Sequence, residues 1–430
     1  MNQTEKPPRV MRSFGATLMS VNGMIGAGIF ALPALLYNAA ENFSPWLFLI
    51  FGLFYACNVL VVARLASLFR ASGGPQLYAE TAFGPFTGFQ VGWILVIAMA
   101  AGRAATLYVL VSYLAVIFPL LEGPVARPVA MLALLAILSG ISISGMRNSI
   151  TGLGVGTVLK LTPILVLCGF GIATGNVATQ LVLPDFETFE SVALLVFFAF
   201  SGTISATFCA GEVKDPGRTI PRSMLLSLAA IILLYMLVQF AYIAAGAPND
   251  GGDATPLAAA AGVFFGQAGL IAMTLGAIFS IATNALTFFI SGPRVIYAMA
   301  ERGLLPHSLS GISERYRTPH RAIVLFTLIV AGIALTGAFA FLVSVMGVAS
   351  LLASLVVFVA FVALHRPGKT SFGAPMTPLW ILILAIAVAF SVYAIVQAPL
   401  ETFALVGVLI AIGTVLYWAT AGRRTSFTAA

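Results

Sequence analysis

Long apolar runs separated by short polar segments fill almost the whole chain. A window of about 19 residues, close to the length that crosses a bilayer as a helix, gives twelve apolar spans. They are expected near residues 12–39, 45–69, 85–118, 128–146, 150–174, 190–212, 223–246, 263–299, 320–341, 343–364, 378–398 and 401–420. No segment alternates apolar and polar residues as a membrane strand does. The pattern therefore predicts an all-α membrane protein with twelve transmembrane helices.

Composition supports this class and excludes an ordinary soluble protein. Of 430 residues, 60% are hydrophobic and 8% are charged, whereas soluble domains carry about 25% charged residues. The three cysteines, Cys57, Cys168 and Cys209, are odd in number and lie in apolar segments. They therefore predict no disulfide framework.

The distribution of basic residues predicts the orientation of the chain. With a cytoplasmic N-terminus, 18 of the 21 Lys and Arg residues fall on the cytoplasmic side and Arg127 alone falls in an outer loop. An excess of Lys and Arg in cytoplasmic loops is typical of membrane proteins. We expect a multi-pass protein of a bacterial-type inner (plasma) membrane with both termini in the cytoplasm. The net charge of +7 is then a sign of orientation, and no nucleic-acid partner is expected.

The first apolar span contains an unusual glycine-rich stretch. Gly23, Gly26 and Gly28 are followed by Pro33, and each glycine costs a helix roughly 1 kcal/mol of propensity. Non-helical backbone inside a membrane is tolerated only where protein or a watery cavity satisfies its polar groups. The stretch indicates either a broken helix at a binding site or close packing against another helix.

A second interruption is expected in the sixth span, at Ser201-Gly202-Thr203. The first and sixth spans each open a set of five, and an odd number of crossings gives the two sets opposite orientations. Broken helices at corresponding positions of two inverted halves point to a transporter site at their interface. This pairing favours the binding-site interpretation of the glycine stretch.

Several motifs, taken together, resemble the amino acid–polyamine–organocation (APC) permeases. They are Gly26–Phe30, Ser72–Tyr78, Phe198–Gly202, Ala210–Pro216, Arg294–Met299 and Gly303–Pro306. The resemblance implies a LeuT-type 5+5 inverted repeat with broken helices 1 and 6, and transport of amino acids by alternating access. The first repeat then covers 12–174 and the second 190–364. Two further helices cover 378–420, and the cytoplasmic tails cover 1–11 and 421–430.

A broken helix offers groups that suit an amino acid zwitterion. The free N–H groups of Ala27 and Gly28 are expected to hold the carboxylate, with Gly26 and Gly202 leaving the backbone bare. By resemblance, the carbonyls of Met24, Phe198 and Ser201 accept hydrogen bonds from the ammonium. Phe198 also matches an aromatic lid over the substrate, although an ordinary core aromatic fits the same spacing.

Lys160 lies about ten residues into the fifth span. An ammonium at this depth costs roughly 2.5–3.5 kcal/mol, and a buried lysine is able to exchange its proton. In proton-coupled relatives a lysine at the matching place occupies the position that sodium fills in sodium-coupled ones. We therefore predict proton coupling through Lys160. The alternative is a side chain that extends to the cytoplasmic face.

Arg103 lies in the middle of the third span, and no carboxylate falls at the same depth. By resemblance this position contacts the substrate side chain, and a glutamate common in the sixth helix of the family is Ile204 here. Both features disfavour cationic substrates. Two options stay open: an acidic substrate paired with Arg103, or a neutral amino acid with Arg103 in a structural role.

These observations predict a secondary active transporter of amino acids, coupled to protons. An amino acid exchanger or exporter of the same fold, or a channel or receptor, is the alternative. The chain has no Gly-x-x-x-x-Gly-Lys loop for a nucleotide and no cluster of metal ligands, so we expect no cofactor and no metal. It is not expected to be an enzyme, because no acid–base pair lies at depth. The oligomeric state is not predicted.

Overall fold

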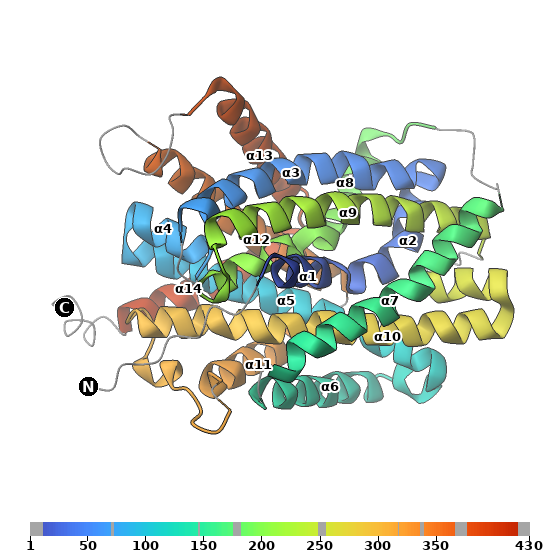
Figure 1. The fold of residues 1–430 in the computed structure, drawn as a ribbon, viewed down its shortest axis with the longest axis horizontal. Coiled ribbons are helices and arrows are strands. Elements are labelled where there is room, and N and C mark those ends of the chain that lie inside the picture. The colour runs from blue at the N-terminus through green and yellow to red at the C-terminus, as the bar shows by residue number, and fades with distance from the viewer. Residues whose placement is uncertain are drawn as a thin grey trace.

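The computed structural model is a bundle of helices (Figure 1). It describes residues 12–69, 73–144, 147–174, 182–247, 255–316, 318–335, 339–365 and 376–419, with the backbone alone for 147–156, 209 and 212. The predicted tails 1–11 and 421–430 lie outside these ranges. The longer helices are α1 (Ser13–Met24), α2 (Ala27–Ala40), α3 (Ser44–Leu68), α4 (Pro75–Phe83), α5 (Pro85–Ile117), α6 (Ala126–Ile143), α7 (Arg147–Ala173), α8 (Phe186–Phe200), α9 (Pro216–Ala245), α10 (Pro256–Glu301), α11 (His320–Ala334), α12 (Phe339–Leu364), α13 (Pro378–Val396) and α14 (Leu400–Ala419). Four 3₁₀ helices accompany them: η1 (Glu41–Phe43), η2 (Pro119–Glu122), η3 (Ser201–Glu212) and η4 (His307–Ser310).

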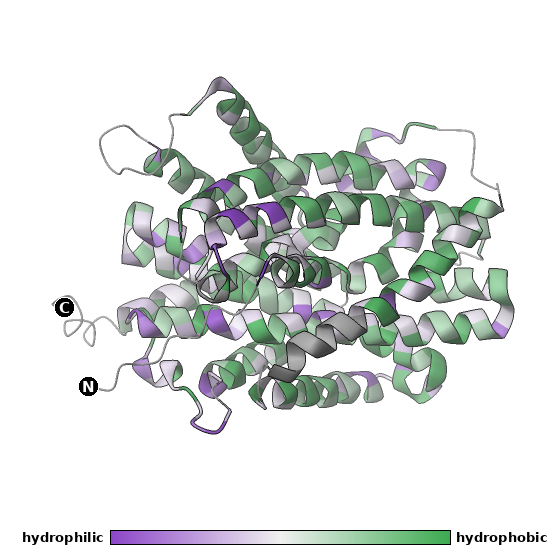
Figure 2. Ribbon diagram, in the orientation of Figure 1, coloured by the Kyte–Doolittle hydropathy of each residue, from purple (hydrophilic) through white to green (hydrophobic). Residues whose placement is uncertain are grey.

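The prediction of a helical membrane protein is confirmed. Within the described ranges, nine helical stretches are long and apolar enough to cross a membrane. One of them, Ala27–Leu68, contains both α2 and α3, while α11 and the stretch Thr157–Ala173 of α7 are shorter apolar helices. Hydrophobic residues predominate along the helices (Figure 2). The arrangement of twelve spans as two inverted repeats stays a prediction.

The sequence marks the starts of many of these helices. Proline, whose missing N–H costs nothing in the first turn, opens α4, α5, α9, α10 and α13. Asp185 caps α8 by accepting a hydrogen bond from the Thr188 N–H at 2.9 Å. Hydrogen bonds from the Thr188 side chain and backbone lower the pKa of Asp185. This carboxylate therefore stays ionised at the positive end of the α8 dipole.

Helix α5 forms the central column of the bundle. It packs against α4, α10, α11 and α12, and 94% of its most apolar stretch is buried. Two polar contacts attach α14 to it: Trp93 Nε1 donates to the Leu409 carbonyl at 2.7 Å, and Gln90 Nε2 donates to Thr414 Oγ1 at 2.8 Å. Helix α1 lies in the interior (Figure 1), in contact with α9, α10 and η3.

Helix α10 turns sharply near its start. Gly266 has φ 62° and ψ −155°, a conformation that essentially only glycine adopts. The short helical segment before it folds back beside the long remainder (Figure 1). The long part of α10 then runs past α1, α5 and α7.

Candidate substrate site

The first apolar span is broken, as its glycines predict. Helical backbone ends at Met24, Ile25 is extended with φ −72° and ψ 92°, and Gly26 has φ −150° and ψ −143° before α2 begins at Ala27. A Cβ on Gly26 would overlap the side-chain amide of Asn284. The break therefore needs a glycine at this position, and the prediction of a discontinuous first span is confirmed.

The other two glycines of the stretch serve close packing. A Cβ on Gly202 would overlap the backbone of Gly23, and a Cβ on Gly23 would lie 2.8 Å from the Gly202 carbonyl oxygen. A Cβ on Gly28 would lie 3.1 Å from the Ala199 Cα. The stretch therefore combines a break at Gly26 with close packing at Gly23 and Gly28, and its role as a binding site stays a prediction. The first and sixth spans cross where backbone meets backbone.

The sixth span changes its helix type instead of unwinding. The α-helix α8 ends at Phe200, and the chain continues as the 3₁₀ helix η3, with φ −59° and ψ −23° at Ser201. Runs of 3₁₀ helix longer than three or four residues are uncommon, and inside a helix they often mark a hinge. The expected rearrangement at Ser201-Gly202-Thr203 is thus a tightened helix with its backbone still helical.

Side chains from neighbouring helices satisfy the carbonyls at the end of α1. Asn284 Nδ2 donates to the carbonyls of Asn22 and Gly23, both at 2.7 Å. Tyr235 Oη donates to the Met24 carbonyl at 2.7 Å. These groups would otherwise be unpaired at a helix end. The sequence prediction missed Asn284 and Tyr235 as partners of the break, although each is a polar residue within an apolar span.

Two predicted acceptors of the ammonium already have protein donors. The Met24 carbonyl receives Tyr235, and the Phe198 carbonyl receives Ser201 Oγ at 2.8 Å. A carbonyl oxygen has two lone pairs. The Met24 carbonyl is therefore able to accept one further hydrogen bond, whereas the Phe198 carbonyl also accepts the Ser201 N–H and has both lone pairs occupied. The N–H groups of Ala27 and Gly28 begin α2, and N–H groups in the first turn have no partner within their helix.

The Lys160 side chain points to the break. Lys160 is 0% exposed, and its Nζ donates to the Ile25 carbonyl at 3.3 Å. The amine is thus tied to α1 and does not extend to the cytoplasmic face. Ile25 is a partner that the sequence prediction did not name.

Arg103 is buried, at 3% exposure, and its partner is neutral. Its Nη1 donates to Asn284 Oδ1, and its guanidinium lies 3.7 Å from the centre of the Phe288 ring. Within the described ranges, no carboxylate lies within ion-pair distance of Arg103 or Lys160, whereas Arg302 and Glu80 form an ion pair elsewhere at 2.9 Å. Sequence reasoning searched for a carboxylate and therefore passed over an asparagine.

These contacts form one polar network around the break. Asn22 Nδ2 donates to Thr157 Oγ1 at 2.9 Å, one helical turn before Lys160. The network thus connects Arg103 of α5, Asn284 of α10, Asn22 of α1 and Thr157 of α7.

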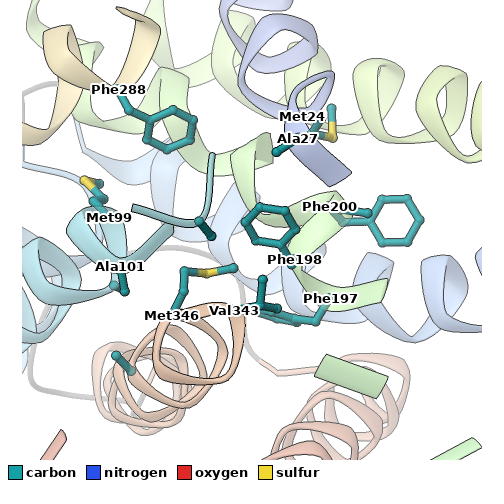
Figure 3. Close-up of a cluster of buried hydrophobic side chains, with 14 of the residues drawn as sticks. Met24, Ala27, Met99, Ala101, Phe197, Phe198, Phe200, Phe288, Val343 and Met346 are labelled. Atoms are coloured by element: carbon teal, nitrogen blue, oxygen red, sulfur yellow. The ribbon is translucent and has the colours of Figure 1, made fainter. Parts of the chain in front are cut away.

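Phe198 lies among apolar side chains beside the break. Figure 3 shows its ring in a cluster with Met24, Ala27, Met99, Phe288 and Met346, while Phe200 points away from it. The Phe198 ring packs edge-on against Phe339, with ring centres 5.8 Å apart. Phe198 is buried. This position suits either a lid or a core residue.

Ser201 and Ile204 lie elsewhere. Both line a small cavity with Tyr55 and Asn58, and Arg103 does not line it. The predicted site residues therefore fall into two groups: those at the α1 break and those at this cavity.

The fold and the break define a class of protein: a helical membrane protein with a polar site built at the interruption of a buried helix. The chain belongs to the amino acid permease family of the APC superfamily. The model of this family matches residues 12–422. This confirms the predicted family. The protein is a transporter and not an enzyme.

Individual relatives show how varied the substrates of similar chains are. An uncharacterised transporter of Mycobacterium tuberculosis is 29% identical, over 77% of this chain and 75% of its own. A serine/threonine exchanger of Bacillus subtilis is 28% identical, over 72% of each chain. A methylthioribose transporter of the same organism is 26% identical, over 95% of this chain and 93% of its own.

Proposed function

We propose that this permease carries neutral amino acids across the plasma membrane by alternating access, in exchange with or together with protons. The observation that carries the proposal is the break at Ile25 and Gly26, to which the Lys160 amine is bound at 3.3 Å. Bare peptide groups and a buried amine meet there. The peptide groups are suited to binding a zwitterion, and the amine is suited to exchanging a proton.

The substrate is bound by backbone groups on both sides of the break. Its carboxylate accepts hydrogen bonds from the N–H groups of Ala27 and Gly28 at the positive end of α2. Its ammonium donates to the Met24 carbonyl, which has one lone pair left, with Gly26 keeping the backbone bare. The twelve-span inverted repeat with both termini in the cytoplasm supplies the two gates.

The contact of Lys160 with α1 supports proton coupling. A protonated amine donates to the Ile25 carbonyl and holds α1 against α7. A neutral amine binds this carbonyl less strongly, because hydrogen bonds from charged donors are roughly twice as strong as neutral ones. Loss of the proton thus weakens one of the contacts between α1 and α7, another being the Asn22–Thr157 hydrogen bond, so that the backbone at the break is able to move.

The environment of Arg103 favours neutral over acidic substrates. Its guanidinium is engaged by Asn284 and by the Phe288 ring, so a substrate carboxylate would have to displace both contacts. Cationic side chains are disfavoured because this buried positive charge has no carboxylate beside it. The serine/threonine exchanger among the relatives agrees with a small neutral substrate and with exchange as a mode of transport.

Transport assays in proteoliposomes test the proposal. An imposed pH gradient is expected to drive accumulation of a labelled neutral amino acid in the wild type. Lys160→Ala is expected to retain exchange of labelled for unlabelled substrate but to lose the response to the gradient. Thr162→Ala, two residues further along α7, is a matched control, because its hydroxyl bonds its own helix at Val158. Accumulation of the label driven by the pH gradient in Lys160→Ala, equal to that in the wild type, would refute coupling through Lys160.

A competition assay tests the substrate class. Serine, threonine and other neutral amino acids are expected to reduce uptake of the label, whereas glutamate, aspartate, arginine and lysine are not. Strong competition by glutamate would instead assign Arg103 to an acidic substrate.

A further inference from the structure

A small cavity lies beside Ser201 and Ile204 of η3, away from the α1 break. Its walls come from α3, α4, α5, α8, η3 and α12, and the space open to water inside it is about 30 Å³. One water molecule needs about 10–15 Å³ by this measure. The cavity is therefore large enough for about two water molecules and too small for an amino acid.

The lining is polar but uncharged. Five of the lining side chains carry a hydroxyl or an amide, namely Tyr55, Asn58, Ser201, Ser350 and Ser354. Among the described residues that line it, none has a charged side chain. An ion would lack a counter-charge here, and an apolar occupant would leave the polar groups unpaired. The lining fits a small, neutral, polar occupant.

The hydrogen bonds already made at the walls determine what the cavity offers. Ser201 Oγ donates to the Phe198 carbonyl at 2.8 Å, Ser354 Oγ to the Ser350 carbonyl at 2.9 Å, and Ser350 Oγ to Met346 Sδ at 3.4 Å. Because each of these serine hydroxyls already donates its hydrogen, its oxygen is available to the cavity only as an acceptor.

Asn58 supplies the complementary donor. The residue is 3% exposed, lines the cavity, and its Nδ2 has no hydrogen-bond partner among the described residues. A buried amide left without a partner costs about 1–3 kcal/mol. Water both donates and accepts, so it is able to serve the Asn58 amide and the serine oxygens together.

We propose that this cavity is a binding site for two water molecules, held by Asn58 and the serine hydroxyls, that joins η3 to α3 and α12. At this cavity, water molecules connect η3 to α3 and α12. Because water exchanges its hydrogen bonds readily, η3 is able to shift against these two helices without breaking a direct side-chain hydrogen bond. The site does not depend on the identity of the substrate or on proton coupling.

Hydroxyl-radical footprinting of the whole protein in detergent or nanodiscs tests this site, because radicals generated from bound water oxidise the buried side chains beside it. Tyr55 and Phe197 line the cavity and are 4% and 3% exposed. They are expected to be oxidised several-fold faster than Tyr113 and Phe326, which are also buried, at 0% exposure, and do not line it. Oxidation of Tyr55 and Phe197 no faster than these two controls would overturn the proposal.

Two variants test how the water is held. Asn58→Leu keeps a similar volume but removes the donor, and it is expected to lower oxidation of Tyr55 to the level of Tyr113. Ser354→Ala removes one acceptor and is expected to lower it less. Wild-type oxidation of Tyr55 in Asn58→Leu would overturn the assignment of the water to Asn58. If that variant does not fold, the wild-type comparison with Tyr113 and Phe326 still decides the proposal.

Discussion

At the scale of single residues, Asn284 connects more of the site than any of the predicted site residues. Its amide oxygen accepts from Arg103, and its amide nitrogen donates to the Asn22 and Gly23 carbonyls. One neutral side chain thus provides Arg103 with an acceptor and caps a broken helix. A carboxylate at this position would attract Arg103 more strongly but would repel the two carbonyls.

Replacing Asn284 tests this role. Asn284→Leu is expected to lower the free energy of unfolding by about 2 kcal/mol, because it removes an acceptor from a buried charge. The change should be visible as a lower melting temperature in detergent. Thr283→Ala is the adjacent control, because the Thr283 hydroxyl bonds only its own helix at Phe279 and its loss is expected to change little. A melting temperature of Asn284→Leu equal to that of Thr283→Ala would contradict the assignment.

Asn284→Asp separates the two halves of the same role. The variant keeps an acceptor for Arg103 but loses the donors to α1. It is expected to fold with Arg103 satisfied while substrate affinity falls, because the end of α1 is no longer held. Binding of a neutral amino acid, measured by calorimetry, checks this expectation. Unchanged affinity would show that the α1 carbonyls do not depend on Asn284.

At the scale of elements, the end of α1 is unusual because other helices cap it. The Val21 carbonyl accepts from the Ile25 N–H at 2.9 Å, and the next carbonyls are served by Asn284 of α10 and Tyr235 of α9. The position of α1 therefore depends on α9 and α10 as well as on its crossing with η3. A movement of either helix changes the hydrogen bonds at the break.

The crossing of α1 and η3 predicts a strong effect of a single methyl group. Gly202→Ala would place its Cβ onto the Gly23 backbone, and overpacking of this kind costs about 1–3 kcal/mol. We expect a lower melting temperature and loss of transport. Gly332→Ala is the control, because nothing lies within 4 Å of its Cβ position in α11 and alanine favours a helix by roughly 0.5–1 kcal/mol. Equal behaviour of the two variants would exclude the close crossing.

At the scale of the whole molecule, hydropathy placed the helices well because the bilayer demands long apolar runs. The break in the first span was also predictable, since Gly23, Gly26 and Gly28 lower helix propensity within one span. The partner of Arg103 was not predictable from one sequence, because a neutral amide 181 residues away does not stand out as a counter-charge does. The 3₁₀ form of η3 was missed because Ser-Gly-Thr is compatible with several local conformations.

The predicted orientation of the chain can be tested on two exposed positions. With both termini in the cytoplasm, Ser308 of η4 lies inside and Glu122 of η2 lies outside, and both are exposed. In a variant without the native cysteines, Ser308→Cys is expected to react with a membrane-impermeant maleimide only after the cells are opened. Glu122→Cys is expected to react in intact cells. The reverse pattern would invert the topology.

The meeting of Gly23 with Gly202 also limits how this protein is able to evolve. In most packed pairs a larger residue on one side is accommodated by a smaller one on the other, so that the two positions vary together. Here neither partner has a side chain to give up, and no second-site change within the pair restores the fit. Suppressor screens starting from Gly202→Ala should therefore return revertants or changes that move a whole helix, and none at position 23.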